Sequence, residues 1–281
     1  MAKVKVITDS TSDIPLNVLD QHDIGLVPLN VHFGDEVYKD QVELTAEQFM
    51  DKLVKSKVHP RTSQPSPGEF VEMYRPFVEK GMDIVSMHLS SSLSGTYQSA
   101  SIAKESFPNA RIEVVDTRLA SMAAGLCVIE AARLAQQGAD IDEVMHVIRD
   151  KCATCHVYFA VDTLDYLHRN GRIGKAAHLM GSLLNMKPIL TLQDGVVISH
   201  DKVRGQKRAT NRLLEIMSEK VPQDAPVKVT IMHSASLQAA ESLSAEIASR
   251  LKVVEATLAP LGAVIATHVG PGTLAVAWIP A

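Results

Sequence analysis

The feature that most constrains the fold is the regular alternation of apolar strand patterns with helix patterns in the first half of the chain. Short apolar runs at residues 4–8, 83–89 and 112–115 are separated by helix patterns, and another run at 24–31 follows a short helix pattern at 16–21. Such alternation predicts a parallel sheet with helices on both faces. We therefore expect an α/β fold whose N-terminal domain is a Rossmann-like parallel-sheet domain.

The second half of the chain has a different order of strand and helix patterns. Two apolar runs flank the sequence Gln193-Asp194-Gly195, which is typical of a hairpin, so antiparallel pairing is expected there. We predict an α+β domain with a mixed sheet and place the domains at 1–155 and 156–281, and the segment around 60–78 is allowed to pack with the second domain. The expected helices are 177–185, 203–221 and 237–251, and the expected strands are 157–161, 188–192, 196–200, 227–232, 254–258, 264–267 and 273–279.

Three turns rich in hydroxyl groups follow three of the predicted parallel strands, at residues 8–13, 90–96 and 116–121. In an open parallel sheet the ligand crevice lies outside the carboxyl ends of the strands, so we expect these turns to meet there. Each turn alone is more often a helix cap. Together, their hydroxyls and the amides at helix N-termini would form a neutral pocket for an anion such as a carboxylate or a phosphate.

The charge balance and the lack of targeting signals exclude several classes of protein. With 28 Lys and Arg against 32 Asp and Glu, the net charge is −4, which disfavours nucleic-acid binding as the main task. The most apolar long stretch, 120–135, is broken by Glu130 and Arg133, so no integral membrane segment is expected. No signal-peptide core is visible, and three cysteines do not suit a disulfide scaffold. We expect a cytoplasmic protein that is a monomer.

Three motifs resemble known cofactor sites, but each lacks a required part. The segment Cys152–His156 matches the haem-attachment pattern, yet covalent haem is added outside the reducing cytosol, so we interpret Cys152 and Cys155 as structural. The segment Gly270–Ala275 resembles a dinucleotide fingerprint but precedes a strand, and Gly171–Lys175 lacks the spacing of a phosphate-binding loop. We find no cluster that suits a metal and no nucleotide site, so we expect no cofactor.

His268 and three arginines are candidates for function that also have ordinary structural interpretations. His268 comes at the end of an expected strand and before a tight turn, and it is either a packing residue or a donor to an anion. Arg172, Arg204 and Arg208 lie in exposed or glycine-flanked basic segments. They form either a solvated face or a docking surface for an acidic partner or a phosphate.

Across essentially its whole length, the sequence resembles the DegV family, whose characterised members include the fatty-acid-binding subunits of bacterial fatty acid kinase. Each motif is weak alone, but their order and spacing are specific. One departure is the segment Ser121–Gly125, where relatives often have an earlier glycine. The motifs that carry the resemblance are Thr8–Pro15, Thr62–Ser66, Ser91–Ala100, Asp116–Thr117, Gly171–Gly174, Lys187–Leu190, Arg204–Ala209 and His268–Gly272.

The resemblance implies a lipid-binding carrier that functions in phospholipid synthesis and holds a long-chain fatty acid between two domains. By this analogy, Thr62 and Ser94 bind the carboxylate, the amide of Gly95 assists, and His268 approaches the same head group from the second domain. The acid is then presented to a separate ATP-dependent kinase subunit and becomes an acyl phosphate. The remaining two positions, Arg172 and Arg204, match family positions linked to kinase docking or phosphoryl transfer.

Two alternatives remain beside the carrier hypothesis. The first is an enzyme for a small carboxylate or phosphate ester, with Ser94 as the nucleophile and His268 as the base. The second is a lipid-sensing regulatory protein whose partner is not a kinase. Turnover by the isolated chain would favour the first, and a partner without an ATP site would favour the second.

Overall fold

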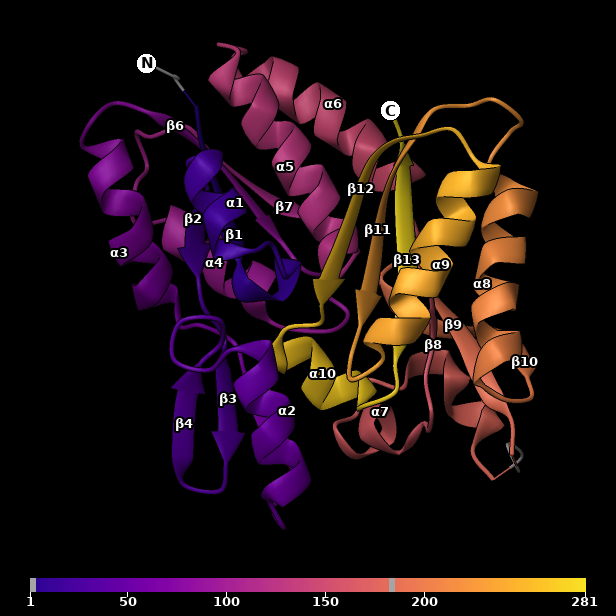
Figure 1. Ribbon diagram of the computed structural model, residues 1–281. Coiled ribbons are helices and arrows are strands. Elements are labelled where there is room, and N and C mark those ends of the chain that lie inside the picture. Colours follow the sequence, from indigo (N-terminus) through magenta and orange to yellow (C-terminus); the bar gives the residue numbers. More distant parts are fainter. Residues whose placement is uncertain (1–3, 182–184) are drawn as a thin grey trace.

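The structure is a computed structural model that describes residues 4–181 and 185–281. Two large sheets organise it (Figure 1). The first has four strands in the order β2-β1-β6-β7, and all neighbouring strands are parallel. The prediction of an α/β fold with a parallel first sheet is therefore confirmed. Its strands are β1 (Val4–Asp9), β2 (Gly25–Val27), β6 (Asp83–His88) and β7 (Ile112–Asp116).

Helices cover both faces of the four-stranded sheet. Ile7 and Ile84 pack with the α3 and α4 side chains on one face, whereas Val6 and Val85 pack in the core that contains α5 and α6 on the other. This alternation follows from the two-residue repeat of a strand. Five helices of the first half are α1 (Leu16–Gln21), α3 (Pro67–Val78), α4 (Thr96–Lys104), α5 (Met122–Gln136) and α6 (Ile141–Thr154).

The second sheet has six strands in the order β10-β9-β8-β13-β11-β12. It is mixed, as predicted, because β11 and β12 are parallel while the other neighbouring pairs are antiparallel. Helices α8 and α9 cover one face, and α5 and α6 contact β13 from the other (Figure 1). The elements are β8 (His156–Ala160), β9 (Lys187–Gln193), β10 (Val196–Val203), α8 (Gln206–Lys220), β11 (Val227–His233), α9 (Leu237–Arg250), β12 (Val253–Pro260) and β13 (Leu274–Pro280).

A third sheet, of three antiparallel strands, was not predicted. The run 24–31, expected to be one strand, is divided between two sheets around Pro28, which has no N–H to donate to a ladder. In this small sheet β3 pairs with both β4 and β5, and Phe33 packs against Phe49 of α2. The elements are β3 (Asn30–Phe33), β4 (Glu36–Lys39), α2 (Ala46–Lys55) and β5 (Arg61–Ser63).

The prediction of a strand at 264–267 is wrong, because these residues lie in the helix α10 (Ala263–Val269). A short apolar run has no periodicity that separates a strand from a buried helix. The helix begins where the amide of Ala263 donates a hydrogen bond of 3.1 Å to Asp40 Oδ1. His268 therefore lies in the last turn of a helix rather than at a strand end.

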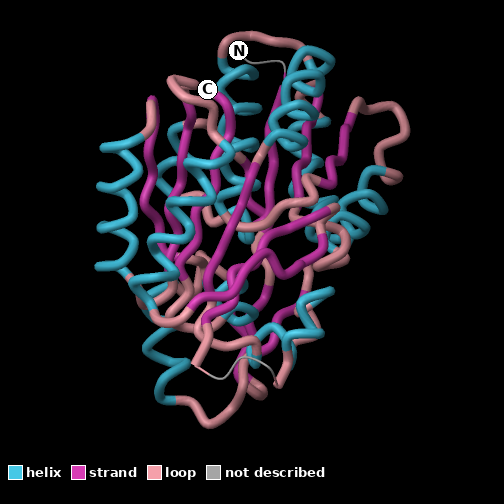
Figure 2. Tube along the Cα trace, turned by 90° about the vertical axis from the view of Figure 1, so that its right-hand side faces the viewer, coloured by secondary structure: helices cyan, strands magenta, loops and turns pink. Residues whose placement is uncertain are grey.

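Short helices complete the chain. In place of the α-helix expected over 177–185, the structure has the 3-10 helix η2 (Gly174–Leu179), and residues 182–184 lie outside the described range. The other short helices are η1 (Ser10–Ser12) and α7 (Asp165–Arg169). The start of β1 and the end of β13 lie at the same end of the molecule in both views (Figures 1 and 2), and α7 and α10 lie in the other half of it in Figure 1.

Helix α5 is buried on almost all its faces between the two large sheets. It contacts β1 on one side and β11 and β13 on the other, and eleven of its fifteen residues are buried. One continuous hydrophobic core therefore contains residues of both sheets, such as Val85 and Ala277. Of the segment 60–78, β5 contacts α10, whereas α3 packs on the four-stranded sheet. The division into two domains near residue 155 stays a prediction.

The three cysteines pack where α6 meets α5, and all three are free. The Sγ atoms of Cys127 and Cys155 lie 3.7 and 3.5 Å from the carbonyl oxygen of Ala123. The Cys152 thiol lowers the pKa of the Cys127 thiol, but the Cys155 thiol and burial raise it, and the net result is a pKa well above the usual value. The Cys127 thiol and burial raise the pKa of Cys152. Thiols held neutral in this way are unreactive, which supports the structural interpretation of Cys152.

Because the two sheets share one core, we predict that they unfold together. Enlarging Ala131, which is fully buried in α5, to Leu should overpack the core and lower the free energy of unfolding by about 1–3 kcal/mol. Thermal unfolding is followed by Trp278 fluorescence, which reports on β13, and by far-ultraviolet circular dichroism. Ala153→Leu on the exposed side of α6 is the control. Separate transitions for the two probes would contradict the shared core.

Candidate ligand site between the two sheets

A cavity of about 390 Å³ lies between the two large sheets. This volume is within the range of about 300–1,000 Å³ that is usual for small-molecule sites. Most of its wall is apolar, so it suits a ligand with a large hydrocarbon part. The apolar lining comes from Leu29, Leu89, Leu93, Ala120, Val157, Phe159, Leu167, Leu192, Val197, Met232, Leu261, Val264, Ile265, Val269 and Ala275.

Polar groups gather where β5 meets α10. The Oγ1 of Thr62 and the Nε2 of His268 share a hydrogen bond of 2.9 Å, although 206 positions separate them in the sequence. Both residues line the cavity, together with Ser94 and Arg172. Four of the predicted site residues are therefore brought to one cavity. The polar lining consists of Thr62, Ser63, Gln64, Ser94, Ser121, Arg172, His268 and Thr273.

The loop before α4 presents Ser94 and Gly95. The Oγ atoms of Ser94 and Thr96 share a hydrogen bond of 2.9 Å, and Gly95 is the N-cap residue of α4. The side chain of Gln64 lies against Gly95, where a Cβ would come within 2.4 Å of Gln64 Oε1. A side chain at position 95 would therefore displace Gln64, so glycine permits the close approach of these two loops.

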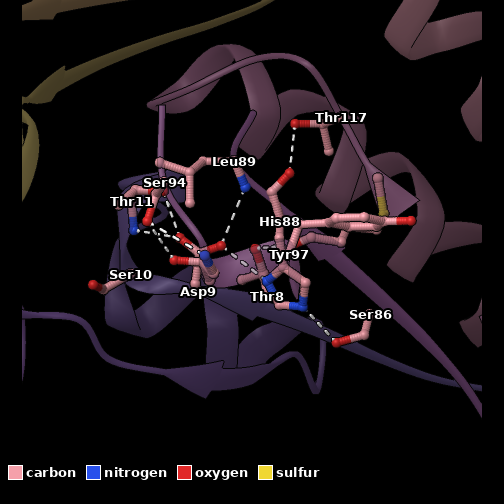
Figure 3. Close-up of polar contacts among 12 residues, drawn as sticks. Thr8, Asp9, Ser10, Thr11, Ser86, His88, Leu89, Ser94, Tyr97 and Thr117 are labelled. Atoms are coloured by element: carbon pink, nitrogen blue, oxygen red, sulfur yellow. Dashed lines mark hydrogen bonds and ion pairs between the residues drawn. The ribbon is translucent and has the colours of Figure 1, made fainter. Parts of the chain in front are cut away.

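A buried network around Asp9 and His88 supports this loop from below (Figure 3). One carboxylate oxygen of Asp9 accepts from His88 Nδ1 at 2.9 Å and from the amide of Leu89 at 3.2 Å, and the other accepts from the amide and hydroxyl of Thr11. The Nε2 of His88 in turn shares a hydrogen bond of 2.7 Å with Ser86 Oγ. These bonds fix the carboxyl end of β6, from which the loop of Ser94 begins.

The hydrogen bonds link Asp9, His88 and Ser86 in the order of a catalytic triad. Their buried position, however, indicates a structural role. All three side chains are buried, and none lines the cavity. The hydroxyl of Tyr74 donates to Ser86 at 2.8 Å, so the serine is already engaged. Ser86 is therefore not placed to attack a substrate.

Ser94 is not hydrogen-bonded to a base among the described residues of this site either. Among the described residues, Ser94 Oγ pairs with Thr96, whereas His268 Nε2 pairs with Thr62. An activated serine needs a base within hydrogen-bonding distance. The geometry thus favours hydrogen bonding to a ligand over nucleophilic attack by Ser94.

His268 is neutral in this site. Burial, followed by the positive charges of Arg172 and His59, lowers the pKa of its imidazole to about 3. Its Nδ1 is buried and has no hydrogen-bond partner among the described residues. A neutral imidazole with one engaged and one free nitrogen can donate a hydrogen bond to an anion without adding a charge.

The two arginines predicted to share a role lie in different surroundings. Arg172 lines the cavity, and its Nε donates to the carbonyl of Leu93 at 3.1 Å while Nη1 donates to Asn170 at 2.7 Å. Arg204 is exposed just before α8 and is not part of the cavity lining. The structure therefore brings Arg172, but not Arg204, to the candidate site.

Of two further residues that shape the site, sequence reasoning missed Asn170 and singled out only the turn that contains Ser121. Asn170 Nδ2 donates to the carbonyl of Thr267 at 3.1 Å and pairs with His59 at 2.9 Å, which ties α7 to α10. Ser121 lines the cavity with φ of 55°, an unusual value for serine. The hydroxyl-rich turn 116–121 did point to Ser121. The turn 8–13, in contrast, supports the site without lining it.

Within residues 4–181 and 185–281, no group of three or more His, Cys, Asp or Glu side chains is arranged to bind a metal ion. No helix of these two ranges has the length and apolar character needed to cross a membrane.

Comparison with known proteins gives concordant matches over the whole chain. A family model described as "Uncharacterised protein, DegV family COG1307" matches residues 3–281. A DegV domain-containing protein of Halalkalibacterium halodurans is 36% identical over 279 residues, which is 99% of each chain. A DegV family protein of Thermus thermophilus has a solved structure that is described as showing fatty acid binding. It is 36% identical to this chain, with a TM-score of 0.94 and 99% of each chain covered. DegV of Bacillus subtilis, described as a fatty acid binding protein, is 32% identical, with a TM-score of 0.89 over the full length of both chains.

The burial of His268 leads to a prediction about its protonation. In the ligand-free protein, this imidazole should stay neutral between pH 8 and pH 5, because its pKa is lowered to about 3. Nitrogen-15 NMR of the histidine side chains measures the charge of each ring during a titration. A histidine-containing model peptide in the same buffer, which gains its proton near pH 6.5, is the control. A midpoint near pH 6.5 for His268 would contradict its burial.

Proposed function

Because the chain belongs to the DegV family and its cavity joins an apolar interior to a cluster of hydrogen-bonding groups, we propose that it binds one long-chain fatty acid between its two sheets. It is a cytoplasmic, monomeric carrier and not itself an enzyme. It presents the carboxylate to a separate ATP-dependent kinase, which forms the acyl phosphate for phospholipid synthesis. The observation that carries the binding proposal is the bond between Thr62 and His268 beside a largely apolar cavity.

The apolar wall supports a hydrocarbon ligand on energetic grounds. Burial of each methylene group contributes about 0.8 kcal/mol, so a dozen methylenes contribute roughly 9–10 kcal/mol before the costs of association are subtracted. The aliphatic side chains of β8, β9, β10 and α10 supply the wall against which such a chain would pack. A small, fully polar substrate would leave this wall in contact with water.

The polar end supports a carboxylate head group. An unpaired carboxylate buried in an apolar site is prohibitively costly, so its oxygens must receive hydrogen bonds. The hydroxyls of Thr62 and Ser94 and the imidazole of His268 are donors on this part of the cavity wall, and the amide of Gly95 lies next to Ser94. Arg172 adds a positive charge nearby. These groups require neither a metal ion nor a nucleotide.

The exposed position of Arg204 supports a role in the encounter with the kinase. Arg204 lies before α8 outside the cavity lining, where its charge is free to attract an acidic surface or a phosphate group. Arg172 links the two regions, because it lines the cavity and is itself exposed. We therefore propose that Arg204 serves docking alone, while Arg172 serves both docking and the bound head group.

The experiment that tests fatty-acid binding is native mass spectrometry followed by denaturation, with palmitic acid supplied. We expect one fatty acid per chain, released on denaturation. Replacing Ser94 by Ala should remove a hydrogen bond to a charged group and weaken binding by about tenfold or more, as measured by titration calorimetry. Ser92→Ala is a matched control, since Ser92 is exposed in the same loop and does not line the cavity. If the wild-type chain takes up no palmitic acid, the proposal of fatty-acid binding is wrong.

The docking proposal gives a prediction for Arg204. In a reconstituted assay with a fatty acid kinase and ATP, Arg204→Ala should lower acyl-phosphate formation at least tenfold at subsaturating carrier. Palmitic acid affinity should be unchanged, because Arg204 does not line the cavity. Arg75→Ala, an exposed arginine on α3, is the control. Equal rates of acyl-phosphate formation for wild type and Arg204→Ala would contradict a docking role for Arg204.

A further inference from the structure

Two buried carboxyl groups from the first half of the chain lie against the start of α10. Asp40 follows β4 and accepts the hydrogen bond from the amide of Ala263. Asp13 follows η1, and a Cβ on Gly262 would come within 2.4 Å of its Oδ1. Asp40 is fully buried and Asp13 is 6% exposed. The first turn of α10 is therefore in contact with two acids that are distant in the sequence.

The same short helix holds His268 at its other end. Only five positions separate Ala263, which Asp40 binds, from His268, which bonds to Thr62. Helix α10 also contacts α2, β3, β5 and η1, all from the first half of the chain, and α7 from the second. Since a helix of seven residues moves as one unit, a shift at its first turn would displace the imidazole.

Asp13 is held in place by a strained partner. Ser121 Oγ donates a hydrogen bond of 2.5 Å to Asp13 Oδ2. Both residues have positive φ, 53° for Asp13 and 55° for Ser121, and such values persist only where the surrounding contacts enforce them. Ser121 also lines the cavity. The contact thus links the start of α10 to the cavity wall by a second route.

We propose that Asp13 and Asp40 are positioning residues for the ligand carboxylate. These two side chains hold α10 against the first half of the chain and thereby fix His268 at the polar end of the cavity. The inference rests on the proposed fatty-acid function for its ligand, but the contact itself is independent of it. We call Asp13, Asp40 and the first turn of α10 the acid clasp.

Within the described part of the chain, no Lys, Arg or His side chain forms an ion pair with Asp13 or Asp40. Burial raises the pKa of Asp40 to about 7 and raises that of Asp13 well above its usual value, and Asp9 adds to both shifts. The hydroxyls of Ser10 and Ser121 and the amides of the α10 first turn act in the opposite direction. No charged side chain of α2, β3 or β5 is among the main influences on either group, and His268 is the one titratable residue of α10.

The sign of the pH effect follows from these raised pKa values. A carboxyl group with a raised pKa in the folded state favours the neutral form there. The stability that it contributes is therefore complete below its ordinary pKa and is lost as the pH rises through the folded value. The acid clasp should hold α10 more firmly at pH 6 than at pH 8, where ionisation adds repulsion between the two acids.

The test measures hydrogen exchange at the amides of Ala263 and Val264 in the ligand-free protein, together with the NMR signal of the His268 ring. Asp40→Ala should lower the protection of these amides at least tenfold, shift the His268 signal and weaken palmitic acid binding about tenfold. Asp40→Asn keeps an acceptor oxygen, so it should keep the protection at pH 6 and show a smaller change between pH 6 and pH 8, because only Asp13 still titrates. Asp35→Ala, an exposed aspartate between β3 and β4, should change none of these quantities.

Several results would overturn the inference. Unchanged amide protection and an unchanged His268 signal in Asp40→Ala would show that the acid clasp holds nothing. Lost protection with unaltered palmitic acid affinity would show that the contact does not position the head group. If Asp40→Ala fails to fold, Asp40→Asn and Ser121→Ala decide the question by the same exchange measurement. If the wild type binds no palmitic acid, the proposed function fails, while exchange and NMR still test the acid clasp.

Discussion

The burial of α5 between the two large sheets is the constraint on which the rest of the structure depends. A helix that is apolar on nearly every face must be covered on every face, so neither sheet can complete its core without the other. The sheets are thereby held at a fixed separation, and the cavity occupies the space beyond the N-terminal end of α5, where Ala120 and Ser121 form part of its wall. The cavity therefore exists because both large sheets pack against α5.

The electrostatics of the site follow from the same burial. His268 is neutral, and the donors around it are hydroxyls and amides, so these groups carry little charge into the interior. Arg172 remains near the surface, where water still screens it. Such an arrangement can accept a carboxylate without having to keep a buried charge when the ligand is absent, which would be costly.

The sequence carried enough information for the two large sheets but not for the small third sheet or for most of the site. Strand and helix patterns predicted the parallel first sheet, the mixed second sheet and the hairpin at Gly195, because their periodicities are local. The helix α10 was mistaken for a strand because its apolar run is too short to have a period. The bond between Thr62 and His268 joins residues 206 apart, so no local pattern could reveal it, and family resemblance alone brought them together. The hydroxyl-rich turns were predicted to meet, since the carboxyl ends of parallel strands lie at one edge, and two of the three do contribute residues, Ser94 and Ser121, to the cavity wall.

The shared core has a consequence for the lifetime of the protein in a cell. A ligand that binds the folded state alone raises the free energy of unfolding by an amount that grows with its concentration. Because α5 joins both sheets into one core, that gain reaches the whole chain rather than one lobe of it. Proteases act on unfolded chains, so a chain that binds such a ligand would be degraded more slowly than one that does not. The abundance of such a carrier would then follow the supply of its own cargo.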